Sequence, residues 1–246
     1  DAAHPASFFA YPDKASDLVA EGCQVHVLSA PDEDAAGALA ALAAALDAPS
    51  DPPVIPAGRP ARPTGELNAE SMANALGALL PEGAVVADEG NTTGLFAQGA
   101  TAGCPPHDWL TLTGGAIGFG LPTATGAAVA VPGRKVICLE ADGSAMYTAQ
   151  SLWTQVREGL DVTTIILNNG SYAVLNMELS RVGAGDPGPR ALSMLDIPGL
   201  DFVALAASMG VPATRATTAE EFTAQLEAAI AVDGPALVEA VVPRTI

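Results

Sequence analysis

The sequence predicts an α/β fold in which a doubly wound parallel sheet is covered by helices on both faces. Short apolar stretches with little polar alternation recur along the chain, and stretches with helical patterns separate them. Continuous apolar strands are typical of parallel sheets that are buried on both faces. Of the 246 residues, 49% are hydrophobic and only 15% are charged, so a sizeable buried core is expected.

A proline-rich segment divides the chain. Before it, residues 24–29 predict a strand, and an acidic turn at residues 31–34 precedes an Ala- and Leu-rich stretch that predicts a helix to Leu46. Six prolines then lie between residues 49 and 63, which excludes a helix or a central strand there. We therefore expect a first segment at residues 1–47, a linker at 48–64 and a second domain at 65–246.

Beyond the linker, predicted strands and helices alternate. The predicted strands cover residues 84–87, 109–112, 135–139, 162–167, 211–214 and 236–242. The predicted helices cover residues 68–80, 148–158, 201–209 and 219–231, and another follows a glycine-rich turn and ends at residue 131. In such a sheet, ligands bind in the crevice at the carboxyl ends of the strands. The residues that follow each strand are therefore the candidates for function.

The charge balance excludes several classes of partner. Ten Lys and Arg residues stand against 28 Asp and Glu residues, which gives a formal net charge of −18. A chain this acidic lacks the positive field that binds nucleic acid or an anionic membrane surface. No run of 18 apolar residues is present, so no membrane-spanning helix is expected. Three widely spaced cysteines argue against a disulfide framework or a zinc site, and a reducing cytoplasmic setting is expected.

Two strand ends predict a magnesium site. Asp142 follows an apolar strand, and Gly143 and Ser144 then begin a helix whose free N–H groups would face an anion. Asn169 follows the next strand, so its amide oxygen is expected near the same cation. A carboxylate, an amide oxygen and a main-chain carbonyl would leave room around Mg²⁺ for two diphosphate oxygens and a water. The alternatives are that Asp142 caps its helix and that residues 168–170 form a plain turn.

These residues resemble a known family. ADGS followed by LNNGSY is similar to the GDG…NN motif of thiamine-diphosphate enzymes. Residues 113–177 resemble the cofactor domain of the acetolactate synthase large subunit family and of relatives such as benzoylformate decarboxylase. The likeness covers about residues 65–243 and implies the thiamine-diphosphate-binding fold, whereas residues 1–47 resemble the tail of the family's central domain. The family's N-terminal pyrimidine-binding domain has no counterpart in this sequence, so we expect a fragment or a processed piece.

The resemblance implies specific contacts with magnesium and with the cofactor's diphosphate. Magnesium would be bound by Asp142, Asn169 and the main-chain carbonyl of Ser171. The residues that would contact the diphosphate are Asn91, Thr92, Gly143 and Ser144.

The resemblance also implies that the glycine-rich turn contacts the rest of the cofactor. Gly115 would offer its carbonyl to the aminopyrimidine, and Ile117, expected to begin a helix, would hold the cofactor bent. The glycines at positions 114 and 115 permit close approach of the backbone. The alternative is that Ile117 is a core residue. In one departure from the motif, Ala141 replaces the first glycine, and we expect its extra methyl group to be tolerated.

The implied chemistry is that of the cofactor. A 2-oxo acid such as pyruvate would lose carbon dioxide, and the remainder would give an aldehyde or join a second 2-oxo acid to give an acetohydroxy acid. The family's site lies between two subunits, which implies a homodimer or a homotetramer. The activating glutamate belongs to the N-terminal domain, so we expect no catalytic residue in this chain and no activity from it alone. The resemblance does not decide whether FAD binds, because some acetolactate synthases hold FAD largely in the central domain.

Three other functions are considered. A benzoylformate-type decarboxylase would use the same cofactor, and a catalytically silent family member would serve as a regulatory or scaffolding subunit. An NAD(P)-dependent oxidoreductase would explain residues 118–123, which partly match a dinucleotide-binding glycine motif, with Glu140 further on. However, Thr123 replaces the third glycine of that motif and Pro122 lies within the turn. The thiamine-diphosphate interpretation is therefore preferred.

Overall fold

The computed structural model describes residues 5–7, 13–183 and 188–244. By its internal contacts the chain divides into two units, Asp1–Val54 and Ile55–Ile246. The division falls within the proline-rich segment. The assignment of residues 1–47 to the tail of another domain stays a prediction.

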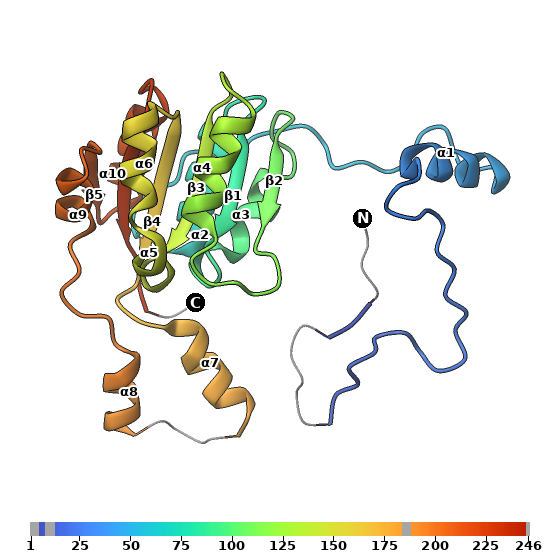
Figure 1. The fold of residues 1–246 in the computed structure, drawn as a ribbon, viewed down its shortest axis with the longest axis horizontal. Helices are drawn as coiled ribbons and strands as arrows, with labels where there is room; N and C mark the ends of the chain where they lie inside the picture. The colour runs from blue at the N-terminus through green and yellow to red at the C-terminus, as the bar shows by residue number, and fades with distance from the viewer. Residues whose placement is uncertain (1–4, 8–12, 184–187, 245–246) are drawn as a thin grey trace. The chain divides into compact units, whose positions relative to one another are not determined.

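In the first unit, one of the two predicted elements forms. Helix α1 (Ala35–Ala45) is present, and the Asp34 carboxylate caps it by accepting a hydrogen bond from Gly37 N at 3.0 Å (Figure 1). The strand predicted at residues 24–29 was wrong, because these residues pair with no strand among the described residues. An apolar segment becomes a stable strand only beside another strand. Val25 and Val27 instead remain exposed.

The second unit is built on a six-stranded sheet in which all neighbouring strands are parallel, as predicted (Figure 1). The order across the sheet is β2-β1-β3-β4-β6-β5. The six strands lie within a few residues of their predicted positions, at β1 (Val85–Glu89), β2 (Asp108–Thr111), β3 (Val136–Ala141), β4 (Val162–Asn168), β5 (Ala213–Ala216) and β6 (Ala236–Val241).

Helices cover both faces of this sheet, as the apolar strands predicted. Along β3, Ile137 and Leu139 pack into one core, and Val136 and Cys138 pack into the other, because successive side chains point to opposite faces. The first core is closed by α2 (Ala69–Leu79), α3 (Ala97–Thr101) and α10 (Ala219–Ile230). The second core is closed by α4 (Gly120–Ala130), α5 (Asp142–Thr148), α6 (Ser151–Glu158) and α9 (Phe202–Ser208).

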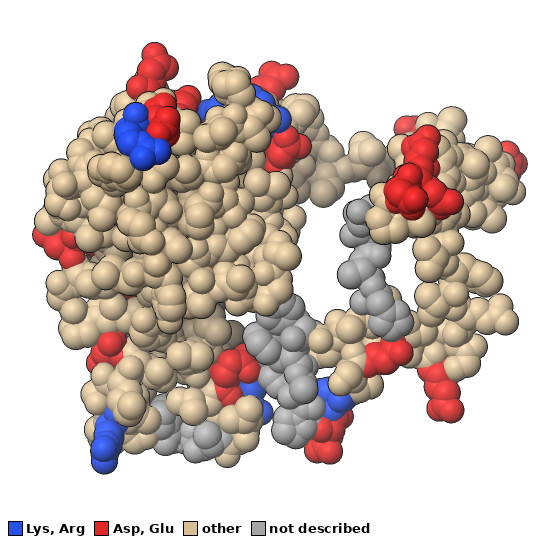
Figure 2. All heavy atoms as spheres, in the orientation of Figure 1, with Lys and Arg blue, Asp and Glu red and all other residues tan. Residues whose placement is uncertain are grey.

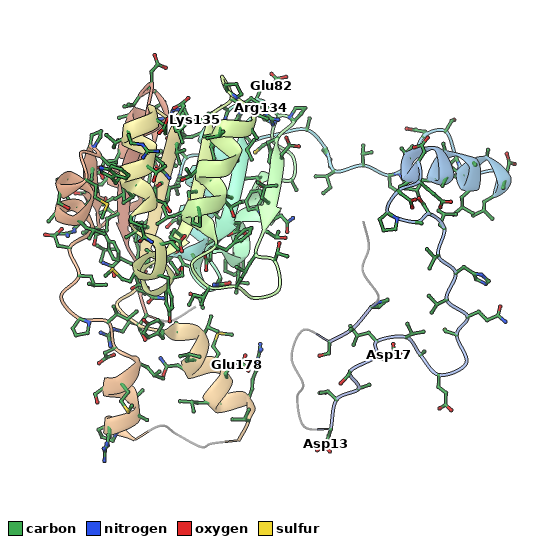
Figure 3. All side chains as sticks on the ribbon, viewed as in Figure 1. Asp13, Asp17, Glu82, Arg134, Lys135 and Glu178 are labelled. Carbon is green, nitrogen blue, oxygen red and sulfur yellow. The ribbon has the colours of Figure 1, made fainter. Side chains whose placement is uncertain are left out.

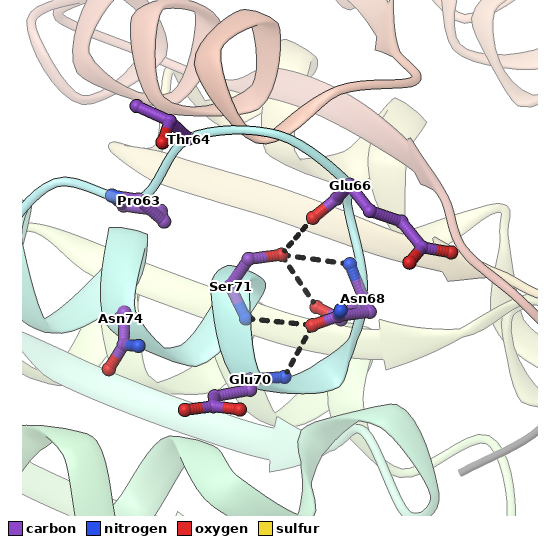
Figure 4. A pocket seen from close by; sticks show the side chains of 7 residues that line it. All are labelled: Pro63, Thr64, Glu66, Asn68, Glu70, Ser71 and Asn74. Carbon is purple, nitrogen blue, oxygen red and sulfur yellow. Dashed lines mark hydrogen bonds between the residues drawn. The ribbon is translucent and has the colours of Figure 1, made fainter.

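Helix α2 begins at a capping box that the sequence places after the linker (Figure 4). The Asn68 side chain accepts hydrogen bonds from the N–H groups of Glu70 and Ser71, at 3.1 and 3.0 Å. In return, the Ser71 hydroxyl accepts one from Asn68 N at 2.8 Å and donates one to the Glu66 carbonyl at 2.8 Å. These hydrogen bonds fix the start of the helix beside the pocket that Asn68 and Ser71 line.

The helices differ from prediction in several places. The helix predicted at residues 148–158 begins only at Ser151, and α5 precedes it as a separate helix. Helices α3 and α8 (Pro189–Leu195) were not predicted, because both are short and neither shows a clear apolar periodicity. The remaining elements are η1 (Thr93–Phe96) and α7 (Ala173–Arg181). Within the part of the chain that the structure describes, no helix is both long enough and apolar enough to span a membrane.

The strand order identifies where a ligand site is expected. From β1 the chain runs outward to β2, and α4 then returns it to β3 on the other side of β1. In a doubly wound sheet, such a reversal opens a crevice at the carboxyl ends of the two central strands. Here those ends are Glu89 of β1 and Ala141 of β3.

Candidate functional site

All the sequence-predicted site residues follow the carboxyl ends of four strands, and these ends share one edge of the sheet. Those after β1 and β2 are Asn91, Thr92, Gly115 and Ile117, and those after β3 and β4 are Asp142, Gly143, Ser144, Asn169 and Ser171. Two basic residues lie at the opposite edge, where Arg134 donates to the Gly83 carbonyl and Lys135 pairs with Asp161 (Figure 3).

Asp142 joins the ends of β3 and β4. Its side chain is 2% exposed, and its two oxygens accept hydrogen bonds from Gly143 N at 2.8 Å and from Gly170 N at 2.7 Å. Burial raises the pKa of this carboxyl, and the N–H groups around it oppose that rise. Because Asp142 is itself the first residue of α5 and bonds across to the next loop, it is not an ordinary helix cap. The N–H of Gly143 was expected to be free, but it already donates a hydrogen bond to the Asp142 carboxylate.

The asparagine loop, residues 168–171, is held by a dense set of hydrogen bonds. Asn169 is 8% exposed, and its side-chain oxygen accepts from Ser171 N at 2.9 Å, which is the turn that the sequence offered as an alternative. Asn168 accepts from Gly170 N at 3.1 Å. The turn and the contact with Asp142 therefore coexist. The loop places Asn169 and Ser171 beside the Asp142 carboxylate, since Gly170 lies between them and bonds to it.

The residues in this corner fit a magnesium ion that takes part of its coordination from a phosphate. The three predicted ligands all offer hard oxygens, and each carbonyl-type oxygen has a second lone pair beyond its hydrogen bond. Among the described residues, no Lys, Arg or His forms an ion pair with the buried Asp142. Nor does the described part of the chain contain three His, Cys, Asp or Glu side chains grouped as a metal site. Three protein oxygens would leave part of the octahedral shell of Mg²⁺ open, and oxygens of a diphosphate would be able to fill it.

The predicted diphosphate contacts differ in what they present. A Cβ at Gly143 would lie 2.5 Å from the ring of Tyr172, so a larger residue would not fit there without movement. The Ser144 hydroxyl is turned inward, to Glu140 and to the Ala141 carbonyl, so only its main chain could face an anion. Asn91 is exposed with a positive φ of 35°, whereas Thr92 is buried at 6% exposure.

The glycine loop, residues 113–120, is exposed over its first half. Gly114 and Gly115 both have positive φ values, of 63° and 68°, which other residues rarely adopt. Ile117 lies in a turn three residues before α4 and does not begin the helix, which corrects the sequence-based expectation. Its side chain is 48% exposed, so the alternative that it belongs to the core is also wrong.

The second half of the glycine loop contacts two buried carboxylates, which sequence reasoning did not identify as part of the site. We call Glu89 and Glu140 the carboxylate pair; they are 1% and 0% exposed and lie opposite each other in β1 and β3. Glu89 accepts from the N–H groups of Gly118 and Gly120, at 2.7 and 2.5 Å. Glu140 accepts from Leu121 N at 3.1 Å. Burial and the neighbouring Glu89 charge raise the pKa of Glu140 to about 8.

A third buried glutamate supports the asparagine loop from the other side. Glu239 of β6 is 1% exposed, and it accepts from Asn168 Nδ2 at 2.7 Å and from Arg215 Nε at 2.8 Å. Arg215 also pairs with Asp201 at 2.7 Å. A series of polar contacts therefore runs from α9 through β5 and β6 to the loop beside Asp142. The signal in the sequence is a glutamate at or near the end of a mainly apolar strand, which all three glutamates share, although Asp88 precedes Glu89 in β1.

The structure also bears on the departure from the motif and on the dinucleotide alternative. Ala141 has φ −83° and ψ 151°, an extended conformation that any residue adopts, so glycine is not required there. Glu140 was the candidate to bind a ribose, but its side chain is fully buried and bonds to Leu121 and Ser144. The dinucleotide interpretation therefore loses its acidic residue.

Among the described residues, Lys and Arg side chains do not gather into a patch on the face drawn in Figure 2. On the face shown in Figure 2, the Lys and Arg side chains of the described residues stand singly or beside Asp and Glu. The expectation that the chain does not bind nucleic acid rests on its net charge and stays a prediction.

Comparison with known proteins relates this geometry to a family model. Residues 88–240 match the model described as "Thiamine pyrophosphate enzyme, C-terminal TPP binding domain". The match extends from β1 into β6 and includes every candidate site residue named above.

Two individual relatives cover 98% and 71% of this chain, but the chain covers less than half of each of them. It is 60% identical over 245 residues to the "Putative acetolactate synthase large subunit IlvX" of Mycobacterium tuberculosis, which spans 98% of this chain and 47% of that protein. It is 36% identical over 176 residues to a benzoylformate decarboxylase of Pseudomonas aeruginosa, which spans 71% of this chain and 32% of that protein.

A solved structure agrees with these sequence relationships. The chain is similar to the thiamine diphosphate-dependent 4-hydroxybenzoylformate decarboxylase of Rhodococcus jostii RHA1, with a TM-score of 0.69 and 32% identity. That similarity covers 84% of this chain and 39% of the other. The chain thus spans about half or less of the length of the relatives that it matches.

Proposed function

This chain belongs to the thiamine pyrophosphate enzymes and contains their C-terminal TPP-binding domain, and from this premise we propose that it binds thiamine diphosphate and Mg²⁺ for a reaction on a 2-oxo acid. Thiamine pyrophosphate and thiamine diphosphate are the same compound. The proposal assigns magnesium to Asp142, Asn169 and the main-chain carbonyl of Ser171. It assigns the diphosphate to Asn91, Thr92 and the main chain of Gly143 and Ser144.

One observation carries the proposal. The Asp142 carboxylate is buried and accepts a hydrogen bond from Gly170 N at 2.7 Å, so the two separate parts of the predicted motif meet in one corner. A buried carboxylate without a basic partner is costly unless a cation or N–H donors compensate its charge. Magnesium bound by a diphosphate would supply that cation and would explain why an aspartate is kept there.

The glycine loop supports the second part of the proposal. We assign the Gly115 carbonyl to the aminopyrimidine and the Ile117 side chain to the surface against which the cofactor bends. An isoleucine that is 48% exposed beside two glycines of positive φ leaves apolar surface open at the predicted site. A bound cofactor would cover that surface.

When bound, thiamine diphosphate supplies the electron sink that lets a 2-oxo acid lose carbon dioxide. This chain's own residues would bind and orient the cofactor, and no described side chain is assigned to proton transfer. The family's activating glutamate has no counterpart in these 246 residues, so we propose that they do not turn over a 2-oxo acid alone. Because the family's site lies between two subunits, we also propose that the working enzyme is a homodimer or a homotetramer.

The relatives favour two outcomes of the reaction. One relative is named an acetolactate synthase large subunit, and two others are named decarboxylases of benzoylformate or 4-hydroxybenzoylformate. We propose an acetolactate synthase-like reaction first, because that relative is the most similar of the three. Incubation of the full-length protein with pyruvate or benzoylformate distinguishes them, since acetolactate supports the first and benzaldehyde the second.

The binding experiment is a calorimetric titration of thiamine diphosphate, with Mg²⁺ or with a chelator. The protein titrated is the full-length protein, by which we mean the whole polypeptide that contains these 246 residues. We expect saturable binding that requires the metal and that disappears in Asp142→Ala. Asp108→Ala is the matched control, because Asp108 begins β2 at the other edge of the sheet and pairs with Arg134. This variant should bind as the wild type does.

Two results would count against the proposal. Metal-independent binding, or equal binding by Asp142→Ala, would remove magnesium from Asp142. The absence of any binding by a folded full-length protein would contradict the proposal and favour the alternative of a catalytically silent family member.

A further inference from the structure

We propose that Glu89 is a positioning residue, which fixes the glycine loop through the N–H groups of Gly118 and Gly120 and so sets where Ile117 meets the cofactor. Glu140 completes the arrangement by joining the start of α4 to α5. The inference rests on the proposed function, because it concerns how the loop is presented to thiamine diphosphate.

The first step is the contact between Glu89 and the loop. Glu89 is the last residue of β1 and is 1% exposed. Its two carboxylate oxygens each accept one N–H of the same turn, from Gly118 at 2.7 Å and from Gly120 at 2.5 Å. Hydrogen bonds from two donors to one buried carboxylate are strong and directional. The end of the loop therefore cannot move independently of the sheet.

The second step is that Gly118 is held from its other side as well. The Thr148 hydroxyl of α5 donates to the Gly118 carbonyl at 3.0 Å. Gly118 has a φ of +84°, and a Cβ there would lie 2.7 Å from Tyr147 Cβ. Residue 118 is thus fixed to both β1 and α5, and Ile117 is directly bonded to it.

The third step is the role of Glu140. Its carboxyl accepts from Leu121 N at 3.1 Å and from the Ser144 hydroxyl, so it links the first turn of α4 to the first turn of α5. A Cβ at Gly120 would lie 2.4 Å from Glu140 Oε2. The glycines at 118 and 120, which partly match a dinucleotide motif, are therefore explained by close contact with α5 and with the carboxylate pair.

The test replaces Glu89 by glutamine in the full-length protein. An amide keeps one acceptor oxygen but turns an NH₂ donor toward the second N–H, so one loop donor loses its partner. We expect hydrogen–deuterium exchange of peptides covering residues 113–121 to speed up roughly tenfold or more without cofactor, and the affinity for thiamine diphosphate with Mg²⁺ to fall roughly tenfold.

Two further variants separate positioning from a general loss of stability. Thr223→Val removes a buried hydroxyl from α10, on the other face of the sheet, and should leave both exchange in the loop and cofactor affinity unchanged. Thr148→Val removes the second hold on Gly118 and should weaken affinity by a smaller factor. If Glu89→Gln does not fold, Thr148→Val still tests whether loosening residue 118 weakens binding.

Each outcome decides the proposal. Faster exchange together with weaker binding supports it. Faster exchange with unchanged affinity overturns it. So does an affinity loss that Thr223→Val reproduces when the two variants have the same melting temperature. Unchanged exchange would show that Glu89 does not hold the loop. If the wild type binds no thiamine diphosphate, the proposed function fails and this role fails with it, whereas exchange in the loop still reports on the Glu89 contact.

Discussion

The two loops that meet at the predicted site are held in opposite ways. In the asparagine loop, Asn169 and Ser171 are buried at 8% and 6% exposure, and the loop forms hydrogen bonds with Asp142 of α5 and with Glu239 of β6. In the glycine loop, residues 113–117 are all exposed, and the described hydrogen bonds to other elements lie at its end, at residues 118 and 120. One loop is fixed throughout, and the other is fixed at its end.

This difference follows from what each loop is proposed to contact. A magnesium ion requires oxygens in a defined arrangement, so a loop that binds it gains from being held rigidly before binding. The glycine loop would instead contact the larger organic part of the cofactor. Its exposed residues then acquire their packing partner only on binding, while the carboxylate pair fixes the end of the loop.

The largest expected effect tests the fixed end of the glycine loop. Gly118→Ala combines a positive φ with a close contact to Tyr147 Cβ, so we expect it to lower the free energy of unfolding by about 2–4 kcal/mol. Gly114→Ala is the control, because a Cβ there meets nothing within 4 Å, and only the strain of about 1 kcal/mol should remain. Chemical denaturation measures both. Equal losses would mean that the two ends of the loop are held alike.

The next effect tests the support of the asparagine loop. Asn168→Ala removes the bonds to Glu239 and to Gly170 N, and we expect a loss of about 2–3 kcal/mol in the free energy of unfolding, because the buried Glu239 loses a partner. The affinity for Mg²⁺ with thiamine diphosphate should fall in parallel. An unchanged affinity in a destabilised protein would show that this support does not position the predicted ligands.

The pH dependence of stability sharpens the comparison, because only the glycine loop rests on two neighbouring carboxyls. Glu140 keeps its proton to about pH 8 in the folded protein, but in the unfolded chain it loses the proton near its ordinary pKa of 4.5. Between these values the folded state binds more protons, so its free energy of unfolding falls as pH rises, by up to about 1.4 kcal/mol per pH unit. In Glu140→Gln the slope should be flatter over that range. Unfolding without metal or cofactor, at several pH values, measures it, and an identical slope would contradict the assignment.

The smallest effect on stability is expected at Ile117. Because its side chain is 48% exposed, Ile117→Ala should change the free energy of unfolding by less than about 0.5 kcal/mol. Ile165→Ala, at a fully buried position of β4, should cost about 2–5 kcal/mol. Cofactor affinity should fall for Ile117→Ala despite its normal stability. Normal affinity would remove Ile117 from the proposed site.

The sequence predicted the strands of the sheet well because the pattern that identifies a strand lies within a few neighbouring residues. Apolar stretches such as Val162–Asn168 can be read without knowledge of their neighbours, and the parallel arrangement follows from the helices between them. The strand predicted at residues 24–29 failed for the same reason, since a local pattern does not reveal whether a partner strand is present. The position of Asp142 beside the asparagine loop was also predictable, because parallel strands end at one edge.

Contacts between distant residues were not predictable in the same way. Nothing in the local pattern of Glu89 shows that it accepts hydrogen bonds from Gly118 and Gly120, which lie about thirty positions later. The Glu140 side chain likewise points inward because α4 packs over it. From the sequence alone, the same residue could equally have bound a ribose. A charged residue in an apolar strand indicates that such a contact exists, but it does not identify the partner.

The central claim is that Asp142 and the asparagine loop hold a metal ion that binds thiamine diphosphate. The most direct test is a crystal structure of the full-length protein with thiamine diphosphate and Mn²⁺, in which anomalous scattering locates the metal. We predict that the ion is bound by Asp142, Asn169 and the carbonyl of Ser171, with the remaining positions filled by diphosphate oxygens and water. A metal at another place, or a cofactor bound without contact to Asp142, would contradict this account.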